Sequence, residues 1–160
     1  MHGVQQAKWE MIEAGGRTAQ SFGLNRLLGQ IYMLLYLTRD PQSLDGLSGQ
    51  LGVSKASLSI ACRQLEGWGA LRRVWVKGDR KDYYEAETDL RRLVNNGLMT
   101  SISKKLDSAK VQIEISLSKL GDGEADEEQV EFLKERLLEA ERYRSRIVKL
   151  VNNPIVKRVF

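Results

Sequence analysis

Basic side chains gather in one part of this 160-residue chain, and their chemistry is that of phosphate binding. Residues 53–81 hold seven lysines and arginines and two acids, a net charge of +5, whereas the whole chain carries +4. Lysine and arginine neutralise phosphates, and arginine also recognises guanine edges. Small polar residues beside them suit a helix that lies in a groove about 12 Å wide, the width of the major groove of DNA. The candidate contact residues are Ser54, Lys55, Ala56, Ser57, Ser59, Arg63, Lys77, Arg80 and Lys81.

Two helices must position the first part of this set. Gly52 is expected to end one helix, because glycine tolerates the left-handed conformation of a tight turn. Ser54, two residues later, can cap the next helix, which is expected to run to Gly69. The buried face of that second helix is predicted from apolar residues at helical spacing, namely Leu58, Ala61, Cys62 and Leu65. The opposite face then carries Ala56, Ser59, Ile60 and Arg63.

A β-hairpin is predicted to position the rest. Residues 71–77 and 82–87 are rich in valine, tryptophan and tyrosine, which favour strands, and residues 78–81 between them have the composition of a turn. The order of helix, tight turn, helix and hairpin predicts a winged helix-turn-helix, whose second helix docks in the major groove of DNA. We name that second helix the recognition helix and the hairpin, residues 71–87, the wing.

Helices are expected on both sides of this motif, so the fold class is mostly α with a small β-hairpin. Residues 5–20 carry a partly apolar stripe that Gly15–Gly16 should interrupt, and residues 24–38 are apolar enough for the central core helix. Pro41 breaks the chain, and Ser43 can cap the helix that ends at Gly52.

The C-terminal part predicts a pair of long helices with a coiled-coil-like character. Thr88 is expected to cap the first, which ends near Leu120 before the turn at residues 121–123, and the second should run from Asp126 to Pro154. Apolar residues spaced by three and four form a seam that a second copy of the chain could cover. The dimerisation residues expected in it are Leu106, Ile113, Leu133, Leu137 and Ile147. In the alternative interpretation the two helices pack only on each other.

The domain organisation predicted is therefore a DNA-binding domain at residues 1–88 and a helical dimerisation region at residues 89–160. Because the longest uninterrupted apolar run is residues 31–37, far short of the ~20 that a membrane span requires, no membrane partner is expected. One cysteine permits no internal disulfide, which is typical of a cytoplasmic protein.

The run LDGLSGQLGVSKASLSIACRQLEGWGALRRVWVKGDRKDYYEAETD resembles the GbsR branch of the MarR-type regulators, and RVWVKGDRKDYYEA is its most specific part. The preceding GRTAQSFGLNRLLGQIYMLLYL also resembles that family, so the likeness covers about residues 4–90. It implies a dimeric transcription regulator, and some members of the family respond to choline-like osmolytes.

Catalytic and metal sites find little support in the sequence. The one histidine, His2, stands near the N-terminus, and one histidine with one cysteine cannot form a zinc site of the Cys/His type. No enzyme, metal or cofactor is therefore expected. Cys62 has two interpretations, a buried apolar residue or a redox sensor, of which we favour the first.

A small-molecule effector is left open by the sequence. An aromatic cage could hold a quaternary ammonium, but ordinary core and interface packing is the interpretation we favour for these side chains. The aromatic residues concerned are Trp9, Phe22, Tyr32, Tyr36, Trp68 and Trp75. The function expected is a homodimeric, sequence-specific regulator that binds double-stranded DNA, more a repressor than an activator. Whether a small-molecule effector controls it stays open. The alternative is a winged-helix adaptor for protein assembly that does not bind DNA.

Overall fold

The computed structural model describes residues 2–121, 123 and 126–159, with the backbone alone for Leu98. The chain forms two compact units, Met1–Gly97 and Leu98–Phe160. Asp122, in the predicted turn before the last long helix, lies outside the described residues.

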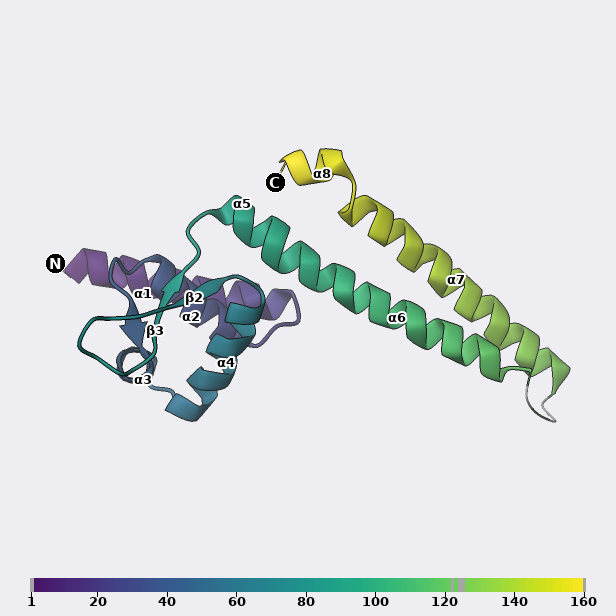
Figure 1. Cartoon of the computed structure of the whole chain (residues 1–160), viewed down its shortest axis with the longest axis horizontal. Coiled ribbons are helices and arrows are strands. Elements are labelled where there is room, and N and C mark those ends of the chain that lie inside the picture. The colour runs from purple at the N-terminus through teal and green to yellow at the C-terminus, as the bar shows by residue number, and fades with distance from the viewer. Residues whose placement is uncertain (1, 122, 124–125, 160) are drawn as a thin grey trace. The chain divides into compact units, whose positions relative to one another are not determined.

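The first unit begins with two helices that approach each other closely (Figure 1), α1 (His2–Ser21) and α2 (Arg26–Tyr36). A methyl group built on Gly15 would lie 2.9 Å from the Gly29 carbonyl oxygen, and one on Gly29 would clash with Gly15. Both Gly15 and Gly16 lie within α1, and the helix continues through them. Glycine is unfavourable within a helix, but because it has no Cβ the backbones of α1 and α2 can touch at Gly15 and Gly29.

Polar contacts also join α1 to α2. The carboxylate of Glu13 forms an ion pair with Arg26 and accepts a hydrogen bond of 2.8 Å from the side-chain amide of Gln30. Asn25 caps α2 by accepting a hydrogen bond from the Leu27 amide, so the helix begins two residues later than predicted.

The helix-turn-helix follows the predicted pattern. Ser43 caps α3 (Leu44–Leu51), and the helix ends at Gly52 with φ at 66°, the left-handed conformation expected there. Ser54 then caps α4 (Lys55–Gly67), the recognition helix, by accepting a hydrogen bond from the Ser57 amide. The helix ends two residues before Gly69, whose φ is 72°.

The wing contains β2 (Leu71–Val74) and β3 (Tyr83–Ala86), both shorter than predicted, with a loop at residues 75–82 that we call the wing loop. A third strand, β1 (Gln42–Ser43), was not predicted and pairs antiparallel with β3. Two residues carry too little β pattern to be recognised, and only the partner strand makes them a strand. The sheet formed by the described residues has the order β1-β3-β2.

The core of this unit lies between α2, α3, α4 and the sheet. All four residues predicted for the inner face of α4 are buried in it, which confirms the predicted orientation of that helix. The other large members are Ile12, Leu28, Ile31, Leu34, Leu35, Leu47, Leu71 and Tyr84.

The chain leaves the wing through α5 (Leu90–Arg92) and a π-helical stretch, η1 (Leu93–Leu98). The predicted cap, Thr88, is wrong. Asp89 takes that role by accepting hydrogen bonds from the Arg91 and Arg92 amides. A methyl group on Gly97 would clash with the Trp68 carbonyl oxygen, so glycine permits the close approach of η1 to the end of α4.

The second unit is a helical hairpin of α6 (Met99–Lys119) and α7 (Glu127–Val151), which lie side by side in opposite directions (Figure 1). Asp126 caps α7 as predicted. α7 ends at Val151 with Asn152 as its C-cap, just before Pro154, as predicted. Pro154 then opens α8 (Pro154–Val159), because proline lacks an amide hydrogen and suits the first position of a helix.

The contact between α1 and α2 gives a test of the fold. We expect Gly29→Ala to lower the free energy of unfolding by about 1–3 kcal/mol, the usual cost of overpacking, although alanine favours helices. Gly49→Ala in α3 is the matched control. No neighbouring atom lies within 4 Å of the added methyl group, so stability should rise by up to about 1 kcal/mol. Urea unfolding of both variants measures the difference, and a stable Gly29→Ala would contradict the close contact.

Candidate nucleic-acid interface

The recognition helix presents an exposed face of mixed chemistry. Ser54, Lys55, Ala56, Ser57 and Arg63 are exposed, and Ser59 is half-buried. Arg63 donates a hydrogen bond of 3.3 Å to the Ser59 carbonyl oxygen, one turn earlier on the same face. Ile60, on this face, leaves 63% of its surface exposed. The face thus offers hydroxyl groups, one guanidinium and an apolar side chain to a ligand.

The wing loop is held in shape by Asp79. Its carboxylate accepts hydrogen bonds from the Lys81 amide at 3.0 Å and from the Tyr83 hydroxyl at 2.8 Å. These two bonds, the Lys81 amide first, keep the pKa of Asp79 below its usual value. Gly78 takes a φ of 89°, as the predicted turn requires. Lys77 and Arg80 are exposed on this loop, as is Trp75, which leaves 88% of its surface exposed.

Two arginines counted in the basic region stabilise the wing itself. Arg73 pairs with Glu66 of the recognition helix at 3.2 Å and with Asp82 at 3.4 Å, and lies over the Tyr84 ring. Arg72 pairs with Glu85 across the sheet at 3.0 Å. Their charges are therefore compensated within the fold.

Two predicted contact lysines meet at an acid that sequence reasoning missed. Asp45 lies in the first turn of α3 and forms two ion pairs. One carboxylate oxygen lies 2.6 Å from Lys55 Nζ, and the other lies 3.1 Å from Lys81 Nζ. The two lysines, Lys55 first, hold the pKa of Asp45 below its usual value. The recognition helix and the wing loop are thus brought together through one carboxylate.

The interface therefore carries less free positive charge than the sequence count indicates. Asp45, Asp82 and Glu85 lie outside residues 53–81 but pair with basic residues inside that range, and they lower its net charge of +5 to +2. Among the described residues, no acid pairs with the remaining three cations, which are Arg63, Lys77 and Arg80.

The aromatic residues considered for an effector have varied surroundings. Tyr32 stacks on Tyr36 with ring centres 5.9 Å apart and donates a hydrogen bond of 2.9 Å to the Glu87 carbonyl oxygen. Burial raises the pKa of Tyr32 to about 12. Trp68 packs against the core, whereas Trp9 and Phe22 are exposed.

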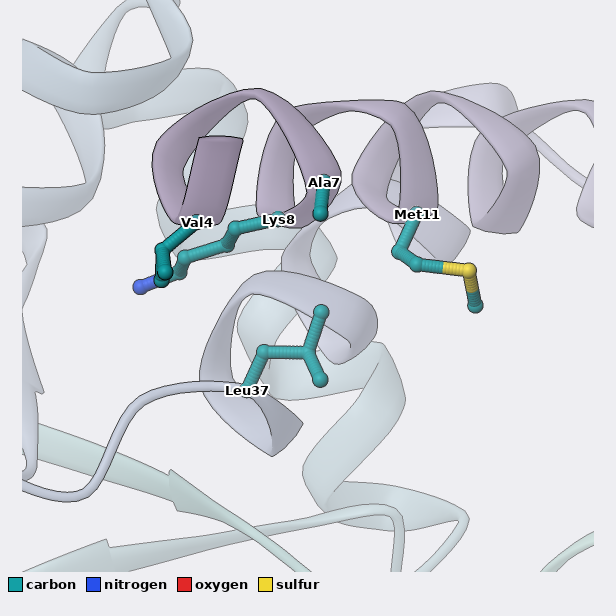
Figure 2. Close-up of a pocket in the computed structure, with 5 residues that line it drawn as sticks. All are labelled: Val4, Ala7, Lys8, Met11 and Leu37. Carbon is teal, nitrogen blue, oxygen red and sulfur yellow. The ribbon is translucent and has the colours of Figure 1, made fainter. Parts of the chain in front are cut away.

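A shallow apolar hollow lies between α1 and the end of α2 (Figure 2). Val4, Ala7, Lys8, Met11 and Leu37 line it, and none of the six aromatic residues does. Lys8 Nζ donates a hydrogen bond of 2.7 Å to the Thr38 hydroxyl. An ammonium group at this place repels a quaternary ammonium ligand, so this hollow is not the aromatic cage that the sequence left open.

The predicted seam residues lie on the α6–α7 hairpin. Leu106, Ile113 and Leu137 are half-buried within it, whereas Leu133 and Ile147 leave 42% and 43% of their surface exposed. The half-buried face of α7 also holds Arg144, whose guanidinium pairs with Glu141 at 2.6 Å and donates to the Leu106 carbonyl oxygen at 3.4 Å.

Other chemistry is sparse in the described part of the chain. It holds no group of three or more histidine, cysteine or acidic side chains placed to bind a metal. None of the helices described there is long and apolar enough to cross a membrane. Cys62 is buried, and this burial, with the charge of Glu66, raises the pKa of its thiol to about 11.

A capped recognition helix, a short sheet and a basic wing loop together define a winged helix-turn-helix domain. A solved structure described as a transcriptional regulator has the same fold, with a TM-score of 0.73 at 24% identity over 96% of this chain and 97% of that one. This likeness confirms the predicted fold class. No protein-family model matches the chain.

Three proteins of Bacillus subtilis (strain 168) are similar in sequence. YvaV, provisionally named an HTH-type transcriptional regulator, is 33% identical over 86 residues, which are 54% of this chain and 49% of that protein. The HTH-type transcriptional repressor OpcR is 30% identical over 86 residues, 54% of this chain and 46% of OpcR. The HTH-type transcriptional repressor GbsR is 28% identical over 93 residues, 58% of this chain and 51% of GbsR. The expected resemblance to GbsR-type regulators is confirmed, and the chain spans about half the length of these relatives.

The buried thiol makes a prediction about the redox alternative. Because the pKa of Cys62 is about 11 instead of 9.0, its thiolate fraction at pH 8 should be about 100-fold lower than in the unfolded chain. Alkylation followed by mass spectrometry should therefore be at least about 100-fold slower in the native protein than in denaturant. Comparable rates in the two states would show an accessible thiol and restore the redox-sensor interpretation.

Proposed function

We propose that this protein is a homodimeric, sequence-specific DNA-binding transcription regulator that acts as a repressor. The observation that carries the proposal is a set of cations that pair with no acid among the described residues, namely Arg63 on the recognition helix and Lys77 and Arg80 on the wing loop. Such cations suit an anionic ligand with a repeating backbone. The repressor names of two relatives support the direction of regulation.

Each part of the interface has a role in this proposal. Ser54 and the first turn of α4 meet a phosphate, Lys55, Ala56, Ser57, Ser59 and Arg63 face base edges or nearby phosphates, and Lys77, Arg80 and Lys81 bring the wing to the backbone or the minor groove. In this proposal residues 1–88 bind DNA and residues 89–160 form the dimer. An effector that changes the affinity for DNA is also part of the proposal.

The dimer is proposed from the exposed apolar side chains of the helical hairpin. These side chains lie on both helices and would be covered by a second copy of the hairpin. They are Val111, Ile115, Phe132, Leu133, Leu138, Tyr143, Ile147 and Leu150. Two recognition helices in one dimer would read half-sites about 34 Å apart, so the operator should be an inverted repeat.

A protein-assembly adaptor is the second candidate. The exposure of Ile60 and Trp75 beside the basic residues favours it, since large exposed apolar side chains are common where a protein partner binds. Selection of bound fragments from genomic DNA with the purified protein separates the two. Enrichment of a common sequence, bound with a steep salt dependence, is the result expected of a regulator. Absence of any salt-dependent retention of DNA would favour the adaptor.

Arg63 is expected to contribute to sequence recognition. If its guanidinium reads a guanine edge, Arg63→Ala should weaken binding to a selected fragment by about 1–3 kcal/mol and change binding to random DNA little. Stability should be nearly unchanged because Arg63 is exposed. Titration of both DNAs by fluorescence anisotropy measures this.

Arg80→Ala is the matched control for this measurement. As a phosphate contact of the wing loop, Arg80 should contribute equally to both DNAs, and its loss should reduce the log–log salt slope by about 0.9. An equal loss on both DNAs in Arg63→Ala would make Arg63 a phosphate contact as well. No loss on either would remove it from the interface.

Dimerisation is tested at the seam. Leu133→Glu with Ile147→Glu should produce a monomer with greatly reduced operator affinity, because both side chains are exposed in one chain and the dimer would have to bury unpaired carboxylates. Gln129→Glu adds a carboxylate at an exposed position of the first turn of α7 and should leave the dimer intact. Sedimentation at micromolar concentration distinguishes the two species, and circular dichroism excludes loss of the helices. A wild-type monomer would contradict the dimer and the inverted-repeat operator with it.

A further inference from the structure

Asp45 lies where the recognition helix and the wing loop meet. Its two carboxylate oxygens each take one ammonium group, Lys55 at 2.6 Å and Lys81 at 3.1 Å. Neither lysine forms another ion pair with a described residue. A phosphate group likewise offers charged oxygens to a pair of lysines, so a carboxylate and a phosphate can each bind the same two ammonium groups.

We propose that Asp45 competes with DNA phosphates for Lys55 and Lys81 and thereby limits the affinity of the interface for DNA. The inference rests on the proposed function and concerns the regulation of the same site. Binding would exchange one carboxylate for phosphates at two lysines, one on the recognition helix and one on the wing loop. Asp45 therefore keeps electrostatic attraction to any DNA low, so that contacts with base edges decide which DNA is bound.

The exposure of the three side chains makes this exchange feasible. Asp45, Lys55 and Lys81 leave 45%, 63% and 59% of their side-chain surface exposed. Ion pairs in such surroundings are weak, because water screens them and long side chains lose freedom when paired. A DNA backbone with its high charge density can therefore displace Asp45, whereas a buried pair would resist.

The opposite role, a brace that holds the wing in place for DNA, is less consistent with the contacts. The wing is already fixed by Arg73, which reaches both Glu66 and Asp82, and by Arg72 with Glu85 across the sheet. Its loop is fixed by Asp79. The fold therefore keeps the wing in position without Asp45, and the carboxylate is left with an electrostatic effect on the two lysines.

Asp45→Asn tests the proposal, because asparagine keeps the shape of the side chain and removes its charge. The variant should bind random DNA about 2- to 30-fold more tightly than the wild type, the range for two released exposed pairs. Its log–log salt slope should increase by up to about 1.8, or 0.9 for each lysine that gains a phosphate. Anisotropy titrations at several salt concentrations measure both, and thermal unfolding checks that α3, still capped by Ser43, is intact.

Two further variants separate this mechanism from a general change in charge. Asp82→Asn removes the same charge from the same unit, but Asp82 pairs with Arg73 and not with either lysine. It should change the affinity much less. In a Lys55→Ala, Lys81→Ala background, Asp45→Asn should lose its effect, since the lysines that it releases are gone.

The outcomes separate the inference from the proposed function. If the wild type binds DNA and Asp45→Asn binds it equally or more weakly, the inference is wrong and the proposed function stands. Equal gains in Asp45→Asn and Asp82→Asn, or a gain that survives without the lysines, would also overturn it. Absence of salt-dependent DNA binding in the wild type and in Asp45→Asn alike would contradict both.

Discussion

Burial of one face of the recognition helix is the constraint on which the interface depends. Four residues of this helix pack into the core, namely Leu58, Ala61, Cys62 and Leu65. Once that face is buried, the rotation of the helix about its own axis is fixed, and so are the residues on its opposite face. Burial therefore decides that Arg63 and Ile60 face outward. The close contact of α1 with α2 at Gly15 and Gly29 completes the scaffold behind this helix.

Ion pairs formed on folding explain why the charges counted along the chain overestimate the net positive charge of the interface. Arg72, Arg73 and the two lysines at Asp45 have acidic partners that lie elsewhere in the sequence. Coulomb interactions depend on distance in space and fall off within about 10 Å at ordinary salt. The interface is thus a few free cations in a framework of paired ones, and part of the pairing can be exchanged for a ligand.

The two units differ in how much apolar surface they bury within one chain. The first unit encloses a continuous core, whereas the apolar residues of the α6–α7 hairpin are half-buried or exposed apart from Val151. A pair of helices can cover only one stripe on each member, and the remaining stripes require another partner. This difference in burial is the physical basis for proposing that one unit contacts DNA and the other self-associates.

Much of this protein was determined by local features of its sequence. The caps at Ser43, Ser54 and Asp126 and the left-handed turn at Gly52 depend on neighbouring residues, and the inward face of α4 follows from helical spacing. Tertiary structure decided the rest. β1 exists because β3 lies beside it, α1 continues through Gly15 because α2 packs there, and Asp45 joins two lysines from separate elements. Each of these depends on residues distant in the chain, and periodicity and capping rules describe only the nearest few positions.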